Sequence, residues 1–301
     1  LLGKAETLRI TRRYDEYFSV LNEFLGGQGA SIDDKADYLM AVLKRTDPKF
    51  IRSFLSNLDE AVIKTVEAHP KDSLALQTAA IYFYSTERND QAEVYFKENA
   101  QEYPESYGAA ADYVEFLMYT DKWEALSREG RKAYERFPHE TAFLEMASVG
   151  DYNLGDHDKV LEICEKVLEV APRDSSKTLR AWSTIGDVYH ELGDSKKSFK
   201  AYEKALKINP DYAYVLNNYA YFLCIEGRRL KKAEDMSYRA VQAEPDNANT
   251  LDTYGWILYL QGKAADAKPV FKHAMLYGGK DSAVILDHYA EVLYALEEYD
   301  L

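Results

Sequence analysis

The sequence predicts an all-α fold in which antiparallel helix pairs stack side by side into a solenoid. The first observation is a repeat, because prolines recur every 34 to 38 residues at Pro70, Pro104, Pro138, Pro172, Pro210 and Pro245. The second is helical spacing, because apolar residues between these prolines lie three or four positions apart. One helix pair cannot bury both of its apolar stripes alone, so each pair requires a neighbour.

Residues 179–212 carry the clearest copy of the repeat. One side of the first helix holds Trp182, Ile185, Gly186 and Tyr189. One side of the second helix holds Ser198, Phe199, Tyr202, Ala205 and Leu206. Pro210 ends the second helix, because proline cannot continue the hydrogen-bond ladder. We expect Trp182 to lie in the core, where truncation to alanine costs roughly 3–5 kcal/mol.

This copy resembles the tetratricopeptide repeat. The 34-residue pattern of that family takes large residues at positions 4, 7, 11 and 24, small residues at 8, 20 and 27, and proline at 32, and residues 179–212 fill every one of these positions. The resemblance implies a right-handed superhelical solenoid. It extends over six full repeats and a terminal helix, at 73–106, 107–140, 141–178, 179–212, 213–247, 248–282 and 283–301.

Two positions depart from the pattern. Gly130 stands where the second repeat should carry an aromatic residue at position 24, and Asp151 stands at the apolar position 11 of the third repeat. We therefore expect looser packing over residues 141–154. The terminal helix over 283–301 either caps the stack or lacks a second helix that was cut away or comes from another chain.

Residues 1–72 are predicted to be helical but atypical, either as a cap or as degenerate repeats. A first helix is expected from about Ala5 to Leu25, before the glycine-rich stretch 26–29. Ser31 predicts the start of a second helix, through about Lys44, since Asp34 follows at the spacing of a capping box. Pro48 predicts the start of a third, continuing as far as His69 and Pro70.

Composition narrows the classes of partner and compartment. The formal charge of −14 argues against nucleic acid, whose binding proteins concentrate lysine and arginine. The sequence contains no run of 18 apolar residues, so no membrane-spanning segment is predicted. The chain opens at Leu1, and we expect that processing or truncation removed the native start. The two cysteines, Cys164 and Cys224, lie two repeats apart, so no disulfide is expected between them. Cysteine usage therefore leaves the redox compartment undetermined.

Catalytic motifs are missing from the sequence, so no enzymatic activity and no cofactor are expected. A phosphate-binding GxxxxGK[ST] loop, a GxSxG elbow, an HExxH helix and a CxxC pair do not occur. The six histidines are scattered along the chain. Asp187, His190 and Glu191 could form a metal-like cluster on one helix face, but a solvated face is the better interpretation, and no metal is expected.

The resemblance implies a concave groove lined by first helices, with a protein or peptide as its occupant. We expect the binding surface in the C-terminal half, where aromatic rings stand beside amides and carboxylates. The candidate groove residues are Tyr214, Asn217, Asn218, Tyr221, Asp252, Trp256, Tyr259, Asp287 and Tyr294. Asn218 and Trp256 could instead orient or pack neighbouring helices. The family's Lys, Asn and Arg clamp for a chaperone C-terminus is missing, and the groove favours neutral or basic partners.

The leading hypothesis is a non-enzymatic scaffold that binds a protein segment in this groove. The alternative is a structural module of a bacterial cell-envelope or secretion assembly, docking by its convex face or its C-terminal end. Three stretches resemble the terminal repeats of exported bacterial members of the family, at 217–223, 251–259 and 285–296. That resemblance implies the periplasm or the outer membrane, with the cytoplasm as alternative. A third hypothesis is an enzyme whose catalytic part lies outside these 301 residues.

Overall fold

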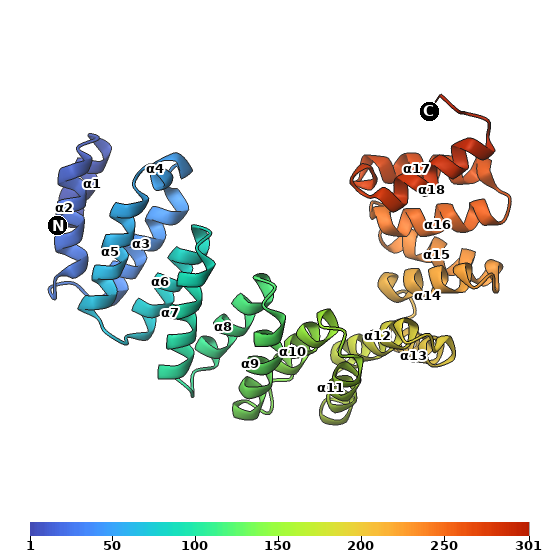
Figure 1. Ribbon diagram of the computed structural model, residues 1–301, viewed down its shortest axis with the longest axis horizontal. Helices are drawn as coiled ribbons and strands as arrows, with labels where there is room; N and C mark the ends of the chain where they lie inside the picture. Colours follow the sequence, from blue (N-terminus) through green and yellow to red (C-terminus); the bar gives the residue numbers. More distant parts are fainter. Residues whose placement is uncertain (301) are drawn as a thin grey trace. The chain divides into compact units, whose positions relative to one another are not determined.

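The computed structural model describes residues 1–300, and the elements in this range are helices. The chain divides into two compact units, unit 1 over Leu1–Asp156 and unit 2 over His157–Leu301. In unit 1 the helices are α1 (Leu2–Ile10), α2 (Tyr14–Gly26), α3 (Ile32–Arg45), α4 (Pro48–Ser53), α5 (Leu55–Ala68), α6 (Ser73–Ser85), α7 (Asn89–Glu102), α8 (Tyr107–Tyr119), α9 (Trp123–Arg136) and α10 (Ala142–Asn153) (Figure 1).

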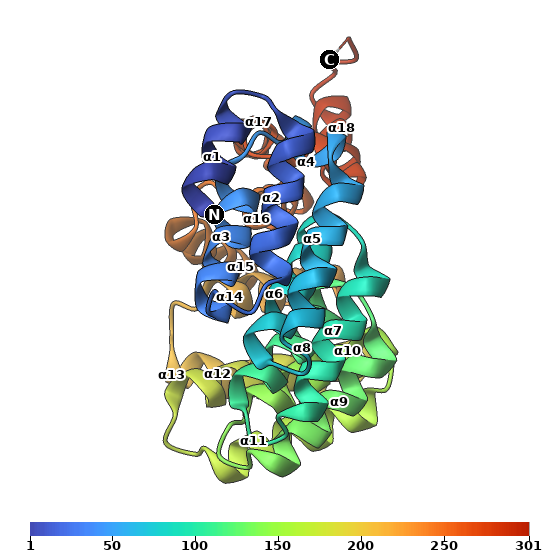
Figure 2. The same ribbon diagram turned by 90° about the vertical axis from the view of Figure 1, so that its left-hand side faces the viewer.

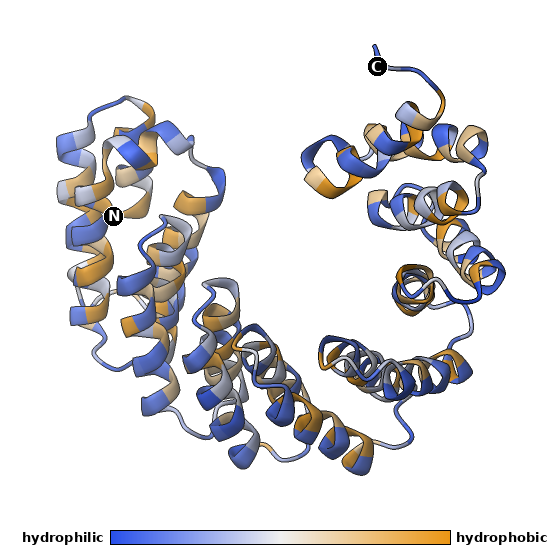
Figure 3. Cartoon of the chain, turned by 45° about the vertical axis from the view of Figure 1, so that its right-hand side comes forward, coloured by the Kyte–Doolittle hydropathy of each residue, from blue (hydrophilic) through white to orange (hydrophobic). Residues whose placement is uncertain are grey.

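Unit 2 continues with α-helices of 13 to 17 residues. They are α11 (His157–Val170), α12 (Ser175–Glu191), α13 (Ser195–Ile208), α14 (Ala213–Ile225), α15 (Leu230–Ala243), α16 (Ala248–Leu260), α17 (Ala264–Leu276), the short 3-10 turn η1 (Gly279–Asp281) and α18 (Ala283–Ala295). Most helices carry both hydrophobic and hydrophilic residues, so each has a side to bury and a side to expose (Figure 3). The predicted all-α repeat architecture is therefore confirmed.

Two contacts explain how a helix pair is built in unit 2. A Cβ atom added at Gly186 of α12 would lie 2.5 Å from Cδ1 of Tyr202 in α13. In the next pair but one, a Cβ at Gly255 of α16 would lie 2.7 Å from Cε2 of Phe271 in α17. The aromatic ring at repeat position 24 thus lies directly on the small residue at position 8. Tyr202 and Phe271 are fully buried as a result.

Trp182 is less buried than the sequence predicts. It is half-buried, and the ammonium of Lys204 lies 3.5 Å from the centre of its ring. Position 4 therefore lies at the edge of the core in this repeat, with a lysine covering the indole.

The packing of α9 against α10 overturns the expectation of a loose segment over 141–154. A Cβ at Gly130 would lie 2.8 Å from the carbonyl oxygen of Phe143, and one at Gly150 would lie 2.7 Å from that of Trp123. The two glycines let the helix backbones approach closely. Asp151 is fully buried there, where it accepts hydrogen bonds from Arg131 Nη2 (2.5 Å) and Ser127 Oγ (2.6 Å).

The N-terminal segment contains more helices than predicted. The expected helix over 5–25 is two helices, because Arg12 takes a left-handed conformation with φ of 60° between α1 and α2. The expected helix from Pro48 to His69 is likewise broken at Phe54. The predicted start at Ser31 is confirmed, since its hydroxyl accepts from the Asp34 amide at 3.2 Å. Figure 2 shows α1, α2, α3 and α5 beside one another.

Membrane insertion through a helix finds no support in the described part of the chain. None of the helices within residues 1–300 is both long enough and apolar enough to cross a bilayer.

Candidate functional site

The predicted binding residues lie on the first helices of unit 2. The side chains of α12, α14, α16 and α18 that contact one another across successive repeats form a surface that we call the first-helix face. Hydrogen bonds join α12 to α14, helix packing joins α14 to α16, and a hydrogen bond joins α16 to α18. Side-chain caps fix where three of these helices begin, at Asp174, Asn247 and Ser282.

The centre of the N-terminal part of this face is the carboxylate of Asp187. It accepts three hydrogen bonds, from Tyr202 Oη (2.5 Å), Tyr214 Oη (2.8 Å) and Asn218 Nδ2 (3.2 Å). These four residues are called the Asp187 cluster. Tyr202 comes from the second helix α13, whereas Tyr214 and Asn218 come from the next first helix, α14. The cluster therefore ties two successive repeats together.

All three donors to Asp187 are neutral groups. Burial raises the pKa of Asp187 above its ordinary value, although the hydrogen bonds from Tyr202, Tyr214 and Asn218 act in the opposite direction. Within residues 1–300 no lysine or arginine forms an ion pair with it. When Asp187 is ionised, its negative charge is solvated by dipoles and is not cancelled by a cation.

His190 lies one helical turn from Asp187 and packs against α14. Its ring stacks on Phe222, with centroids 3.3 Å apart and planes 12° apart. Burial lowers the pKa of His190, while Glu226, Asp187 and Glu191 act to raise it. The three carboxylates around this imidazole give this end of the first-helix face a negative electrostatic potential.

A second group joins α16 to α18. His288 Nδ1 lies 2.9 Å from Asp252 Oδ1, and both side chains are largely buried. The His288 ring stacks on Trp256, with centroids 4.0 Å apart, and Trp256 in turn stacks on Tyr259 at 5.0 Å. Tyr259 Oη donates to Glu291 Oε2 at 3.3 Å. These five residues are called the His288 cluster.

The remaining predicted residues are not brought into either cluster. Asn217 Nδ2 lies 3.4 Å from Asn218 Oδ1, and Asn217 Oδ1 is buried without a hydrogen-bond partner in the described chain. Tyr221 is half-buried against its neighbour Phe222. Asp287 is exposed, and Tyr294 is 69% exposed with its ring against Tyr299.

The candidate groove residues did not include several members of the two clusters. Tyr202 was assigned only to the core, because position 24 is a core position of the repeat. Its hydroxyl nevertheless reaches Asp187, and a tyrosine opposite an aspartate at position 9 is the signal that could have revealed this contact. His288 lies 36 residues after Asp252, and Glu291 lies 32 residues after Tyr259, so each contact joins one first helix to the next.

The arrangement suits recognition by charge and stacking. The acceptors of Asp187 are already hydrogen-bonded by tyrosine and asparagine, and His190 is held against Phe222. Within residues 1–300, no three His, Cys, Asp or Glu side chains come together as a metal site requires. Both cysteines are buried, and no disulfide joins them.

A family model matches part of unit 2. It describes the tetratricopeptide-repeat domain of cytochrome c-type biogenesis protein H, and it covers residues 173–283. Among curated proteins, the search found no match.

Solved structures share the fold at low sequence identity. A tetratricopeptide-repeat protein from Parabacteroides merdae superposes with a TM-score of 0.59 and 14% identity, over 86% of this chain and 99% of that one. The hetero-tetramer Cut9–Hcn1 of the APC/C gives a TM-score of 0.57 and 13% identity, over 97% of this chain. This chain spans only 55% of that matched chain. At these identities the likeness concerns the fold alone.

Proposed function

We propose that this chain, a tetratricopeptide-repeat protein, is a non-enzymatic scaffold whose first-helix face in unit 2 binds a neutral or basic segment of another protein. The repeat fold itself supports a protein-interaction role. The observation that carries the finer proposal is the Asp187 cluster, in which a carboxylate is held by three neutral donors and has no cationic partner within residues 1–300.

Charge gives the first part of the argument. A lysine or arginine placed near Asp187 gains attraction from a carboxylate whose desolvation was largely incurred when the chain folded. Glu191 and Glu226 lie close enough to His190 to act to raise its pKa, as Asp187 does. They add negative charge near Asp187. An acidic segment would meet like charges at this end of the face.

Aromatic rings give the second part. Trp256 lies between His288 and Tyr259, and each of these two residues is hydrogen-bonded to a carboxylate. A rigid aromatic ring supported by its neighbours is the usual anchor at an interface, because little side-chain entropy is lost when it is covered. Trp256 is half-buried, so part of its ring is available for contact.

The test measures fluorescence anisotropy with two labelled peptides of equal length, one rich in Lys and Arg and the other rich in Gln and Asn around the same tyrosine. Asp187→Asn keeps the size and most hydrogen bonds of the side chain but removes its charge. It should weaken the Lys/Arg peptide about tenfold and leave the Gln/Asn peptide nearly unchanged. Trp256→Ala should weaken both.

Matched controls lie on the second helix α15. Asp235→Asn removes an exposed carboxylate and Tyr238→Ala removes an exposed ring, both in the same unit. Neither should change the affinity for either peptide. Equal effects of Asp187→Asn and Asp235→Asn would contradict the proposal, as would unchanged binding by Trp256→Ala.

A second candidate function is a module of a bacterial envelope or secretion assembly. The match of residues 173–283 to the repeat domain of a cytochrome c-type biogenesis protein favours it. It would place the protein in the periplasm or at the outer membrane, with the cytoplasm as the alternative. Cell fractionation of the native protein, with sequencing of its mature N-terminus, tests it. A cytoplasmic protein that retains its first methionine would exclude it.

A further inference from the structure

Basic residues gather in one part of an acidic chain. Residues 195–232 contain nine lysines and arginines and three acidic residues, whereas the whole chain has a net charge of −14. Five of the lysines lie on the second helix α13, and the others lie in the turn before α15 and in its first turn. The concentration is therefore a property of the second-helix side of unit 2.

These residues surround a surface cavity. The cavity has a volume of about 620 Å³ and lies between α13 and the turn that joins α14 to α15. Its principal lining side chains are Lys196, Lys200, Arg228, Arg229, Phe199 and Tyr219. Arg229 takes a left-handed conformation with φ of 50°, in a turn that is one residue longer than the repeat pattern requires. This turn carries both rim arginines, Arg228 and Arg229.

Three of the four cations at this rim are not used by the fold. Lys196, Lys200 and Arg229 are exposed, and their charged groups make no hydrogen bond or ion pair with other residues in 1–300. Arg228 lies 3.5 Å from Glu226. Glu203, the acidic residue that lines the cavity, is occupied by Tyr219 Oη (3.1 Å) and by Lys232 (3.7 Å). The cavity therefore presents net positive charge.

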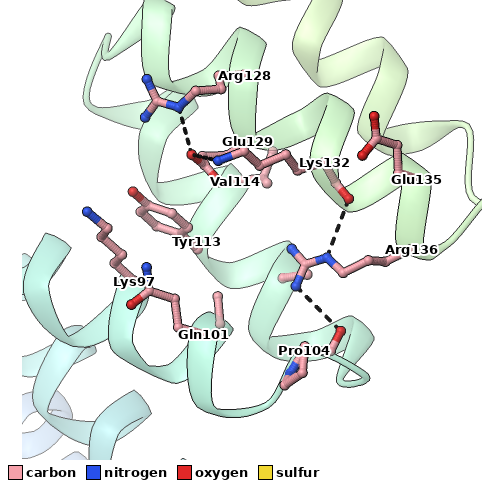
Figure 4. A pocket seen from close by; sticks show the side chains of 12 residues that line it. Lys97, Gln101, Pro104, Tyr113, Val114, Arg128, Glu129, Lys132, Glu135 and Arg136 are labelled. Carbon is pink, nitrogen blue, oxygen red and sulfur yellow. Dashed lines mark hydrogen bonds and ion pairs between the residues drawn. The ribbon is translucent and has the colours of Figure 1, made fainter.

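A similar cavity in unit 1 shows what a structural role looks like. That cavity, of about 580 Å³, also has basic walls (Figure 4). Three of its four cations are committed to the protein, whereas Lys97 is exposed and unpaired within residues 1–300. Arg128 (2.8 Å) and Lys132 (3.1 Å) both contact Glu129. Arg136 donates to the carbonyl oxygen of Lys132 at 3.4 Å and to that of Pro104 at 3.5 Å. The cavity beside α13 differs because only one of its four rim cations, Arg228, has an acidic partner within residues 1–300.

The floor of the cavity beside α13 is apolar and aromatic. Phe199 and Tyr219 stack with centroids 4.8 Å apart, and Leu223 is buried next to them. Lys232 lies 4.4 Å from the centre of the Tyr219 ring, which holds the ring in place. A basic rim around an apolar floor matches a chain segment that has carboxylates on both sides of one large apolar side chain.

We propose that this cavity binds an acidic segment of a partner protein through Lys196, Lys200, Arg228 and Arg229, with one apolar side chain of the segment on the half-buried ring of Phe199. The site lies on the second-helix side and is separate from the first-helix face. Nucleic acid fits less well, because a long polyanion would extend beyond the basic patch onto a chain whose net charge is −14. Like charges there repel it over a Debye length of about 8–10 Å.

The experiment measures binding of a labelled peptide in which Glu and Asp surround one Phe, and of the same peptide with Gln and Asn. The wild-type protein should bind the acidic form more tightly, with an affinity that falls as salt rises. Lys196→Glu/Lys200→Glu should weaken it by about tenfold or more. The matched control Lys44→Glu/Lys97→Glu makes the same charge change at two exposed lysines of unit 1, one of them from the cavity in Figure 4. It should change the affinity by less than about twofold.

Each outcome decides the proposal. No binding of the acidic peptide, equal binding of its Gln/Asn form, or equal losses in the two double variants would overturn it. A short single-stranded DNA that binds more tightly than the peptide, and whose binding is lost with Lys196→Glu/Lys200→Glu, would assign the site to nucleic acid instead.

Asp187→Asn should leave acidic-peptide binding unchanged, so failure of this proposal is distinguishable from failure of the first-helix-face proposal. Thermal melting monitored by circular dichroism verifies that both double variants fold.

Discussion

Replacing Gly186 with alanine tests the contact on which each helix pair depends. The added Cβ would lie 2.5 Å from Cδ1 and 2.9 Å from Cζ of the Tyr202 ring, where ordinary carbon contacts are at least 3.4 Å. The ring cannot easily tilt away, because Tyr202 is fully buried and its hydroxyl donates to Asp187 at 2.5 Å. Relief of the overlap must therefore displace either the α12–α13 pair or the Asp187 cluster.

Two opposed effects set the magnitude. Alanine is a better helix former than glycine by about 1 kcal/mol, which stabilises α12. Overpacking of a well-filled core costs about 1–3 kcal/mol, and the overlap here involves a full ring edge. We expect the second effect to be larger, so that Gly186→Ala lowers the free energy of unfolding.

Urea unfolding of the full chain measures the change, and a double-mutant cycle isolates its cause. In a Tyr202→Leu background the ring is gone, so Gly186→Ala should become neutral or stabilising, with a coupling free energy of about 1–3 kcal/mol. Gly108→Ala provides the control, because an added Cβ at Gly108 of α8 meets only Ser106 Oγ, at 3.9 Å. That variant should be as stable as the wild type or more stable.

A stabilising Gly186→Ala in the wild-type background would refute the reasoning. It would mean that the Tyr202 ring does not lie on position 8, and the hydrogen bond from Tyr202 to Asp187 would then lose its geometric basis. A coupling free energy near zero would lead to the same conclusion.

Three further predictions concern buried charges and the edge of the core. Arg131→Ala should destabilise unit 1 more than Asp151→Ala, because it leaves the fully buried Asp151 carboxylate with only Ser127 as partner. Urea unfolding should show a loss in the free energy of unfolding of about 3 kcal/mol for Arg131→Ala and of about 1–3 kcal/mol for Asp151→Ala. Trp182→Ala should cost only about 2 kcal/mol, since its half-buried indole has Lys204 on one face; a loss of 4 kcal/mol or more would place the ring in the core after all. Because burial raises the pKa of Asp187, the folded chain keeps this proton at pH values where the unfolded chain has lost it, so this residue's contribution to stability falls as pH rises from the ordinary aspartate pKa through the raised one. Asp187→Asn should lack that decrease, and urea midpoints for both proteins over acidic to neutral pH would show parallel curves if the pKa of Asp187 were not raised.

The repeat pattern predicted the fold well because its rules are local. Spacings of three and four, the small residues Gly186 and Gly255, and the terminating prolines act within one helix pair, so the sequence alone reveals them. The prediction was wrong where helix pairs deviate from the pattern. Gly130 and Asp151 suggested loose packing separately, whereas together with Gly150 they build a close crossing of α9 and α10 with a buried ion pair.

The N-terminal helices show a different limit. Hydrophobic periodicity runs through Arg12 and Phe54 without a break, so one helix was predicted where the structure has two. Arginine at a φ of 60° carries no sequence signal, because residues other than glycine rarely take this conformation. Only tertiary packing of the short helices determines these breaks.

The sequence placed the candidate residues on the first helices of unit 2, but the contacts of these residues were not predictable in detail. Tyr214, Asn218, Asp252, Trp256 and Tyr259 contact other parts of the first-helix face, whereas Asp287 and Tyr294 do not join a cluster. Which hydroxyl or amide reaches Asp187 depends on the offset between successive repeats. That offset arises from packing, and a 34-residue pattern does not contain it.

The central claim is that a segment of another protein binds across the first helices of unit 2. Hydrogen–deuterium exchange of the full chain with and without the Lys/Arg peptide measures this most directly. We predict slower exchange in α12, α14 and α16, with no change in α13, α15 and α17, and loss of the effect in Asp187→Asn. Protection confined to α13, α15 and α17, or protection that persists unchanged in Asp187→Asn, would contradict the claim.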